Sequence, residues 1–275
     1  MQSNPYIYRK RSLIPLLLAA GLLCAPCLFS QVGLGLSPMR LDLQFGKNRQ
    51  HSGSLHLSNT AGQKARVRSE LLDFFIDVDE TPQFERVIAK EADSSCRSWL
   101  SLNPMEVELE PQSSVWVRYT FRIPEGVAEG SYHCAAGFST VPTASATGEI
   151  GIQTAVRMVA VFYAVVGAPK IDGGFQEIKL EPVPGQAPPA WRAVVVLKNP
   201  ARMHFRPTGD LVVLDSGGNV IESVPFRSVP VLPNREQRFL FPLKTLQAEV
   251  PCRLRARVDI GTQEVLEGAA TLTPH

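Results

Sequence analysis

Alternation between apolar and polar residues is the dominant pattern of this chain. In LEPQSSVWVRYTF (109–121), a proline turn precedes a stretch in which every second residue is apolar. A similar turn and stretch, VLPNREQRFLF, follows at 231–241. Strict alternation is typical of a β-strand with one buried face. The repetition predicts that the same β-plan occurs twice.

The rest of the chain reads in the same way. Short stretches rich in Val, Leu, Phe and Thr are separated by Pro, Gly, Asn and Asp, and only 86–100 has room for a short turn of helix. Roughly six or seven strands in each half, with turns at intervals of about 8–12 residues, are typical of antiparallel sandwiches. We therefore predict an all-β protein with two tandem immunoglobulin-like β-sandwiches.

The two halves also match in order. SLHLSN and VVVLKN are strands that end at Asn59 and Asn199, and Asn suits a turn. Gly, Pro and Asp in VVGAPKIDGG mark the joint. The predicted segments are a signal peptide at 1–30, a first sandwich at 31–167 and a second sandwich at 168–275.

Residues 1–30 have a basic start followed by an apolar run, the pattern of a secretory signal peptide. An uncleaved membrane anchor is the alternative, but Pro15 and Pro26 interrupt the run and Ser30 suits cleavage. Cleavage removes three of 28 Lys and Arg and no acidic residue, which leaves 25 against 26 Asp and Glu. The mature chain then has no basic excess for nucleic acid and no further apolar run of membrane length.

Cysteine use fits an exported protein. Cys96, Cys134 and Cys252 lie outside the signal peptide, and an oxidising compartment would allow one pair to join. Cys96 and Cys134 are the favoured pair because both lie in the first half. Three separate core thiols are the alternative. Tyr132, two residues before Cys134, has the spacing of a tyrosine corner.

Catalytic and metal-binding patterns are missing from the sequence. The five His residues are scattered without ligand spacing, and neither a nucleophile elbow nor a zinc-protease motif occurs. The acidic DVDET (77–81) fits a solvated turn better than a calcium loop. In RLRARVD (253–259) the arginines fit the solvent-exposed face of a strand. We expect no enzyme activity, no cofactor and no metal.

Without an active site, strand edges become the candidate sites. An open edge can accept a strand from another polypeptide. The long stretch EIGIQTAVRMVAVFYAVV places an apolar ladder on one face; the alternative is a central, buried strand. The residues of this ladder are Ile150, Ile152, Thr154 and Val156.

The first half resembles the PapD-like periplasmic chaperones of pilus assembly. The resemblance runs from SPMRLDLQFGKNRQHSGSLHLSN through SWLSLNPMEVELEPQSSVWVRYTF to IQTAVRMVAVFY; the second half resembles a generic bacterial Ig-like module. It implies a non-enzymatic protein that lends a strand to an incomplete subunit. Two basic residues in the family hold the subunit's C-terminal carboxylate.

Arg40 matches the first of these basic positions. Ala160 occupies the second, and Arg157 is three residues away and is expected on the other face unless a bulge intervenes. The departure puts a strict pilus role in doubt, because one cation instead of two loses a charge-assisted hydrogen bond.

Together with the export signal, this resemblance implies a periplasmic chaperone or assembly factor. Its expected partners are pilin-like or surface subunits, with an outer-membrane usher as a further partner. The alternative is a secreted structural or adhesive surface protein that uses Ig-like domains as interaction modules.

Overall fold

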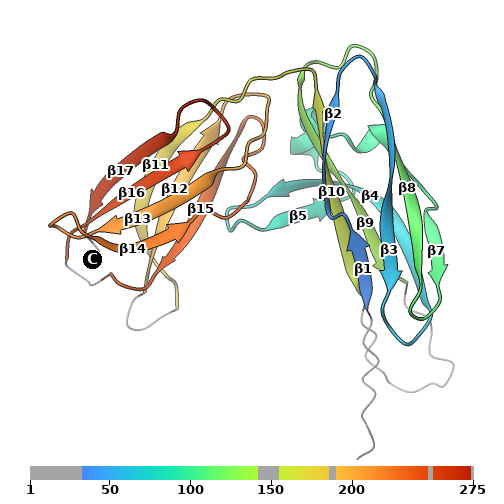
Figure 1. Ribbon diagram of the computed structural model, residues 1–275, viewed down its shortest axis with the longest axis horizontal. Helices are drawn as coiled ribbons and strands as arrows, with labels where there is room; N and C mark the ends of the chain where they lie inside the picture. The colour runs from blue at the N-terminus through green and yellow to red at the C-terminus, as the bar shows by residue number, and fades with distance from the viewer. Residues whose placement is uncertain (1–32, 142–154, 186–189, 247–249, 274–275) are drawn as a thin grey trace, which may run out of the picture. The chain divides into compact units, whose positions relative to one another are not determined.

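The computed structural model describes residues 33–141, 155–185, 190–246 and 250–273. The strands before residue 167 form two sheets, and those after residue 173 form two more (Figure 1). The predicted all-β fold is confirmed. Within the described ranges, no helix is both long and apolar enough to cross a bilayer.

The first two sheets face each other across a common core. One has the strand order β1-β3-β8-β6, and the other has the order β2-β10-β9-β4-β5, with β7 beside β4. Their bounds are β1 (Leu34–Ser37), β3 (Gln50–Asn59), β8 (Ser114–Arg122), β6 (Leu100–Asn103), β2 (Arg40–Phe45), β10 (Arg157–Val166), β9 (Gly130–Thr140), β4 (Ala65–Ile76), β5 (Pro82–Glu85) and β7 (Glu106–Leu109).

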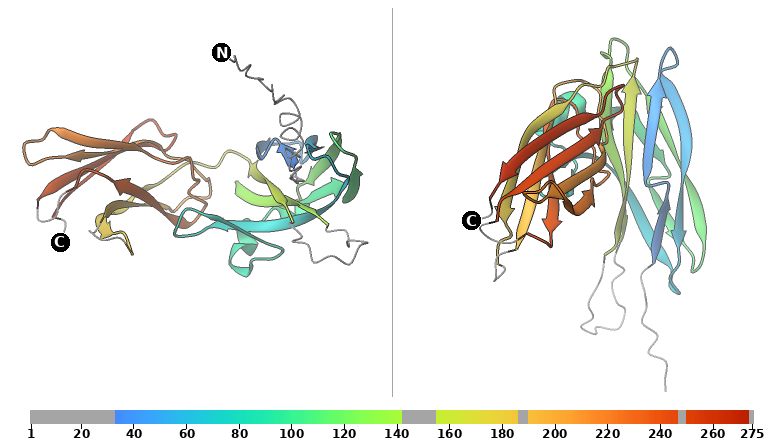
Figure 2. Two further views of the ribbon diagram at one scale, coloured as in Figure 1. Left: turned by 90° about the horizontal axis from the view of Figure 1, so that it is seen from below. Right: turned by 60° about the vertical axis from the view of Figure 1, so that its left-hand side comes forward.

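The later strands, seen as two layers in Figure 2, form the other two sheets. One has the order β11-β12-β15 and the other β14-β13-β16-β17. Their bounds are β11 (Gly174–Pro182), β12 (Trp191–Asn199), β15 (Arg235–Leu243), β14 (Val220–Pro225), β13 (Thr208–Leu214), β16 (Cys252–Asp259) and β17 (Leu266–Leu272).

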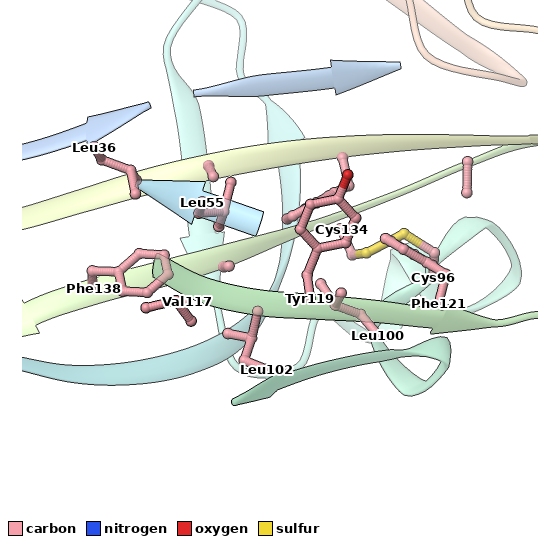
Figure 3. Packing of buried hydrophobic residues seen from close by; sticks show 14 of the residues in the cluster. Leu36, Leu55, Cys96, Leu100, Leu102, Val117, Tyr119, Phe121, Cys134 and Phe138 are labelled. Carbon is pink, nitrogen blue, oxygen red and sulfur yellow. A yellow bond between two sulfur atoms is a disulfide. The ribbon is translucent and has the colours of Figure 1, made fainter. Parts of the chain in front are cut away.

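Alternation places the predicted apolar faces in these cores. Val117, Tyr119 and Phe121 of β8 are buried (Figure 3). Phe121 packs on Phe162 of β10 with ring centroids 5.4 Å apart. Trp116, on the other face of β8, is 65% exposed. Burial of each large apolar side chain stabilises the fold by about 1.5–3 kcal/mol. The apolar face of β8 is therefore the one directed toward the core.

The first strand divides between the two sheets. The sequence suggested one strand through SPMRLDLQF, but β1 pairs with β3, whereas β2 pairs with β10 in the opposite sheet. The change of sheet falls between Ser37 and Arg40, at Pro38. Proline has no N–H to give to a ladder, so it suits the point where pairing stops.

The repeated pattern has a common hydrogen-bond scheme. Asn59 donates from its side-chain amide to the carbonyls of Gln63, Leu109 and Glu110, and its Oδ1 accepts from the N–H of Ala61. These bonds tie the end of β3 to the proline turn before β8, where buried backbone carbonyls need donors.

The second half repeats this scheme. Asn199 donates to the carbonyls of Met203 and Val231, and its Oδ1 accepts from the N–H of Ala201. Both Asn side chains are almost fully buried. The two matching sequence stretches therefore mark the same feature, a buried Asn that joins the end of a strand to a proline turn by hydrogen bonds. We call this feature the Asn clip, and it occurs once in each half.

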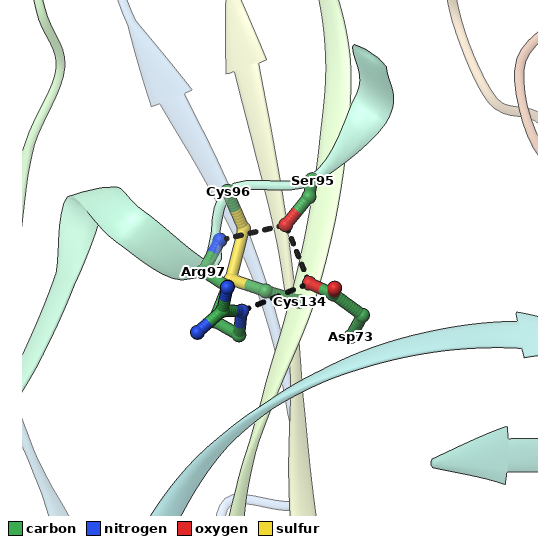
Figure 4. Close-up of a disulfide and its surroundings, with 5 residues drawn as sticks. All are labelled: Asp73, Ser95, Cys96, Arg97 and Cys134. Carbon is green, nitrogen blue, oxygen red and sulfur yellow. Dashed lines mark hydrogen bonds and ion pairs between the residues drawn. A yellow bond between two sulfur atoms is a disulfide. The ribbon is translucent and has the colours of Figure 1, made fainter. Parts of the chain in front are cut away.

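Residues 86–100 form two short 3₁₀ turns, η2 (Ala89–Ser94) and η3 (Arg97–Trp99). Cys96 between them is joined to Cys134 of β9 by a disulfide, and Cys252 is buried as a free thiol. Asp73 of β4 accepts a hydrogen bond from Ser95 Oγ at 2.6 Å and lies 3.4 Å from Arg97 Nε (Figure 4). The turns are thus held to the sheet covalently and by charge.

Tyr132 forms the expected corner. Its hydroxyl donates to the carbonyl of Ala128 at 2.8 Å, and it accepts from Arg202 at 3.2 Å. The start of β9 is therefore tied back to the preceding loop.

Removing the disulfide should lower stability without changing the fold. The bridge spans 38 residues of sequence, and loop closure of that length is worth about 3–4 kcal/mol by restricting the unfolded chain. We expect the double substitution Cys96→Ser and Cys134→Ser to lower the free energy of unfolding by this amount in urea titrations.

Reductant provides the matched control. It should destabilise the wild-type protein by a similar amount and leave the double variant unchanged. Equal stability of the wild-type protein with and without reductant would contradict the prediction.

Candidate functional site

Strand β10 has a partner along all of one edge and along only part of the other. It pairs with β9 from Arg157 to Val166, but β2 pairs with it only from Val161 onward. No described strand pairs with Arg157–Ala160 on the side away from β9. We call this segment the free edge.

The hydrogen-bond pattern shows which backbone groups reach the free edge. The N–H of Val161 donates to the carbonyl of Met39, and the N–H of Gly167 donates to that of Phe45. Residues of β10 with odd numbers therefore direct their N–H and C=O groups away from β9. By this alternation, Arg157 and Val159 present theirs along the free edge.

The residues predicted from the sequence for this margin are only partly visible. The carbonyl of Val156 accepts a hydrogen bond from the N–H of Thr140, and the N–H of Val156 donates to Thr140 Oγ1. Ile150, Ile152 and Thr154 lie outside the described residues. The partner-binding role of this ladder therefore stays a prediction.

The register of β10 settles where Arg157 and Ala160 point. Pairing with β9 is continuous, with no bulge. Arg157 forms an ion pair with Glu70 of β4 at 2.7 Å, and Ala160 is fully buried in the core between the sheets. Neither residue supplies a cation beside Arg40.

A pocket of about 360 Å³ lies beside the end of the free edge. Arg40, which is opposite Val161 in the β2–β10 register, lines it. Most of the other lining is apolar and comes from both halves of the chain. It consists of Phe74, Ile76, Pro82, Phe84, Val161, Tyr163, Val229 and Pro230, with Glu80, Arg206 and Ser228 as polar members.

Arg40 is held by a neighbour on its own strand. Its Nε lies 3.1 Å from Asp42, and both side chains are about half exposed. Nearby His204, whose Nε2 lies 3.8 Å from Asp42 Oδ1, is the main cause that lowers the pKa of Asp42. The charges of Arg40 and Arg206 lower it further, whereas burial opposes them. Asp42 is therefore a carboxylate at neutral pH and orients Arg40.

His204 brings the second half of the chain to this site. Its ring stacks on Tyr163 at 4.5 Å between centroids, and its Nδ1 is 2.5 Å from Ser131 Oγ. Leu232 also packs on the outer face of the sheet that contains β4 and β10, beside Phe74 and Tyr163. The pocket itself is lined from the second half by residues that follow β12 and precede β15, namely Arg206, Ser228, Val229 and Pro230.

Arg206 is the functional candidate that sequence reasoning missed. Its guanidinium lies over the Tyr163 ring, with the central carbon 4.9 Å from the ring centroid. Its NH1 group donates to the carbonyl of Ser228 at 2.8 Å. It stands in HFRPTG, a loop with no pattern of its own, so only the tertiary fold could reveal that it lies near Arg40.

The acidic stretch at 77–81 is more than a solvated turn. Asp77 accepts hydrogen bonds from the N–H groups of Asp79 and Thr81, which shapes the loop. Glu80 takes a positive φ of 61°, and its side chain is only 2% exposed. The solvated reading is therefore wrong for Glu80. Among the described residues no group could hold a metal ion.

Burial raises the pKa of Glu80, and two weaker interactions oppose the rise. Arg227 is 3.5 Å from its Oε2, and the N–H of Leu240 is bonded to the same oxygen at 3.4 Å. Its Oε1 has no hydrogen-bond partner. A buried carboxyl with a free oxygen costs stability when it is ionised.

Comparison with known proteins gives structural matches only. No family model and no curated relative matches the sequence. A structure titled as a chaperone–tip adhesin complex of CFA/I fimbriae aligns with 89% of this chain and 100% of its own, at 10% identity and a TM-score of 0.49.

Two further solved structures are similar. The YadV chaperone aligns with 87% of this chain and 99% of its own (12% identity, TM-score 0.47). The CupB2 chaperone of Pseudomonas aeruginosa aligns with 88% and 100% (13% identity, TM-score 0.44).

Replacing Glu80 with Gln should stabilise the protein at neutral pH. A raised pKa means that the folded state binds the proton more tightly, so wild-type stability falls as pH rises above the ordinary value of the carboxyl. Gln keeps the shape and cannot ionise. We expect a higher melting temperature than wild type at pH 7 and no difference below about pH 4.

Glu106→Gln is the matched control, because the pKa of Glu106 is shifted in the opposite direction from that of Glu80. Hydrogen bonds from Arg66 lower the pKa of Glu106, with Arg68 adding to the effect. This variant should not gain stability at pH 7. A Glu80→Gln protein that melts below wild type at pH 7 would show that the ionised carboxylate is needed.

Proposed function

We propose that this protein is a non-catalytic periplasmic chaperone or assembly factor that binds partner polypeptides by edge-strand pairing. The observation that carries the proposal is the free edge of β10. There, backbone donors and acceptors of Arg157 and Val159 lie next to a pocket that contains Arg40.

Strand addition satisfies the chemistry of this edge. A strand laid beside Arg157–Ala160 would bond to the outward N–H and C=O groups of Arg157 and Val159. Each such bond contributes about 0.5–1.5 kcal/mol net. The sequence extends the margin through the predicted ladder Ile150, Ile152, Thr154 and Val156, which would add apolar side chains to the contact.

The position of β2 limits where an added strand can run. Because β2 fills the edge from Val161 onward, the incoming strand must end near Arg40. A guanidinium at the end of a strand suits a carboxylate. We therefore expect the partner's C-terminus at Arg40, with the partner strand parallel to β10.

The partner class follows from this mode of binding and from the family that the sequence resembles. A β-rich pilin-like or surface subunit with an exposed edge would gain the missing strand and lose its tendency to aggregate. An outer-membrane usher belongs to the same proposal, as does export to the periplasm.

A proline at Val159 should separate binding from folding. The N–H of Val159 faces the free edge, so Val159→Pro removes a donor from the margin and none from the β9–β10 ladder. We expect the variant to stay folded by circular dichroism and to lose at least about tenfold in affinity for its β-rich client, because two pairing bonds are disturbed.

Met158→Pro is the matched control. Met158 is opposite Phe138 and uses its N–H in the ladder with β9, so this variant should be strongly destabilised. Client co-purification with Val159→Pro at the wild-type level would contradict edge pairing. A monomer that captures no client and adheres to cells or matrix would favour the surface-protein alternative.

A further inference from the structure

Arg206, which lines the pocket beside Arg40, has a hydrogen-bond donor without a partner. Arg206 Nε is buried and has no partner. A buried donor without an acceptor costs about 1–3 kcal/mol, and native structures rarely leave one unpaired. Because Arg206 lines the pocket, its guanidinium can meet an acceptor that enters the pocket, although Nε itself lies below the surface.

The position of Arg206 is fixed by its surroundings. The preceding residue, Phe205, is buried and exchanges backbone hydrogen bonds with Val231. The bond to Ser228 and the contact with Tyr163 hold the guanidinium at the pocket wall. Among the described residues Arg206 forms no ion pair, so its charge is available to a ligand.

The positive charges of Arg40 and Arg206 influence the same groups beside the pocket. Both charges lower the pKa of Asp42 and oppose the rise in the pKa of Tyr163 that burial causes. Asp42 faces Arg40 and His204. The remaining acidic group at the pocket is Glu80, which interacts with Arg227 and the N–H of Leu240. The pocket therefore offers two guanidinium groups from two parts of the fold.

The apolar walls suit a side chain as well as a charge. Phe74, Ile76 and Phe84 line the same space, and its volume is near the lower end of the roughly 300–1,000 Å³ typical of ligand pockets. One terminal residue with a large apolar side chain would bury that side chain and place its carboxylate between the arginines.

We propose that Arg206 is the second cation of this site, acting with Arg40 on the C-terminal carboxylate of a partner that ends in a large apolar residue. The inference rests on the proposed function. The cation comes from the second half of the chain, whereas position 160 of β10 holds a buried alanine. Arg206 is thereby a specificity-determining residue for the partner's chain end.

The test uses a short synthetic peptide of alternating Val and Thr that ends in Phe. Binding to the full mature chain is measured by fluorescence anisotropy for the free acid and for the C-terminal amide. Wild type should prefer the acid by about 10–100-fold, the range expected of charge-assisted bonds. In Arg206→Gln that preference should fall by about tenfold, while amide affinity stays unchanged.

Matched variants exclude a loss of folding. Arg253→Gln removes an exposed arginine from β16 and should keep the full preference for the acid. Arg206→Lys should restore part of it, because the charge remains without the planar fork. Melting temperatures of all variants confirm that each is folded at the assay temperature.

Each outcome separates the two proposals. Val159→Pro should weaken both peptides, whereas Arg206→Gln should weaken only the acid. If wild type binds acid and amide equally, or if Arg206→Gln keeps the full preference, the role of Arg206 is wrong and edge pairing stands. If wild type binds neither peptide, the proposed function is wrong, and this inference with it.

Discussion

The site depends on one constraint, that every backbone N–H and C=O of a strand needs a partner. Along β10 the chain meets this need with β9 on one side and with β2 on part of the other. Within the described part of the chain the rest of this edge, Arg157–Ala160, has no partner strand, because the first strand changes sheet between Ser37 and Arg40. The same change of sheet that creates the free edge also places Arg40 at its end, so edge and cation come from one feature of the fold.

The repeated pattern serves both halves, but with different results. In each, a buried Asn clips a proline turn, through Leu109 in the first half and Val231 in the second. In the second half the next residue, Leu232, packs on the outer face of β9 and β10 beside Tyr163. The Asn199 bond to Val231 thus holds the turn that directly follows Val229 and Pro230, two residues that line the pocket. A motif whose first role is to hold a sandwich together here also shapes the wall of a site.

Local patterns explain what the sequence could predict. Alternation predicted the strands and paired Asn residues predicted the repeat, whereas Arg40 was proposed from the resemblance alone. The change of sheet was missed because alternation continues across Pro38 and does not say which neighbour a strand takes. Arg206 and Glu80 were missed because their burial is set by residues distant in sequence. A lone arginine in a loop and an acidic turn look solvated until the fold encloses them.

A cation supplied by the second half instead of by β10 would have a physical consequence. A lysine at position 160 would belong to the first sandwich alone, whereas Arg206 reaches the pocket only while both halves stay in contact. That contact includes an ion pair in which Glu91, 2% exposed, accepts from Arg235, 40% exposed, at 2.8 Å. Capture of a carboxylate between Arg40 and Arg206 would add to this coupling, because the anion bridges residues from both halves. Binding and the arrangement of the two halves are then linked, and each stabilises the other.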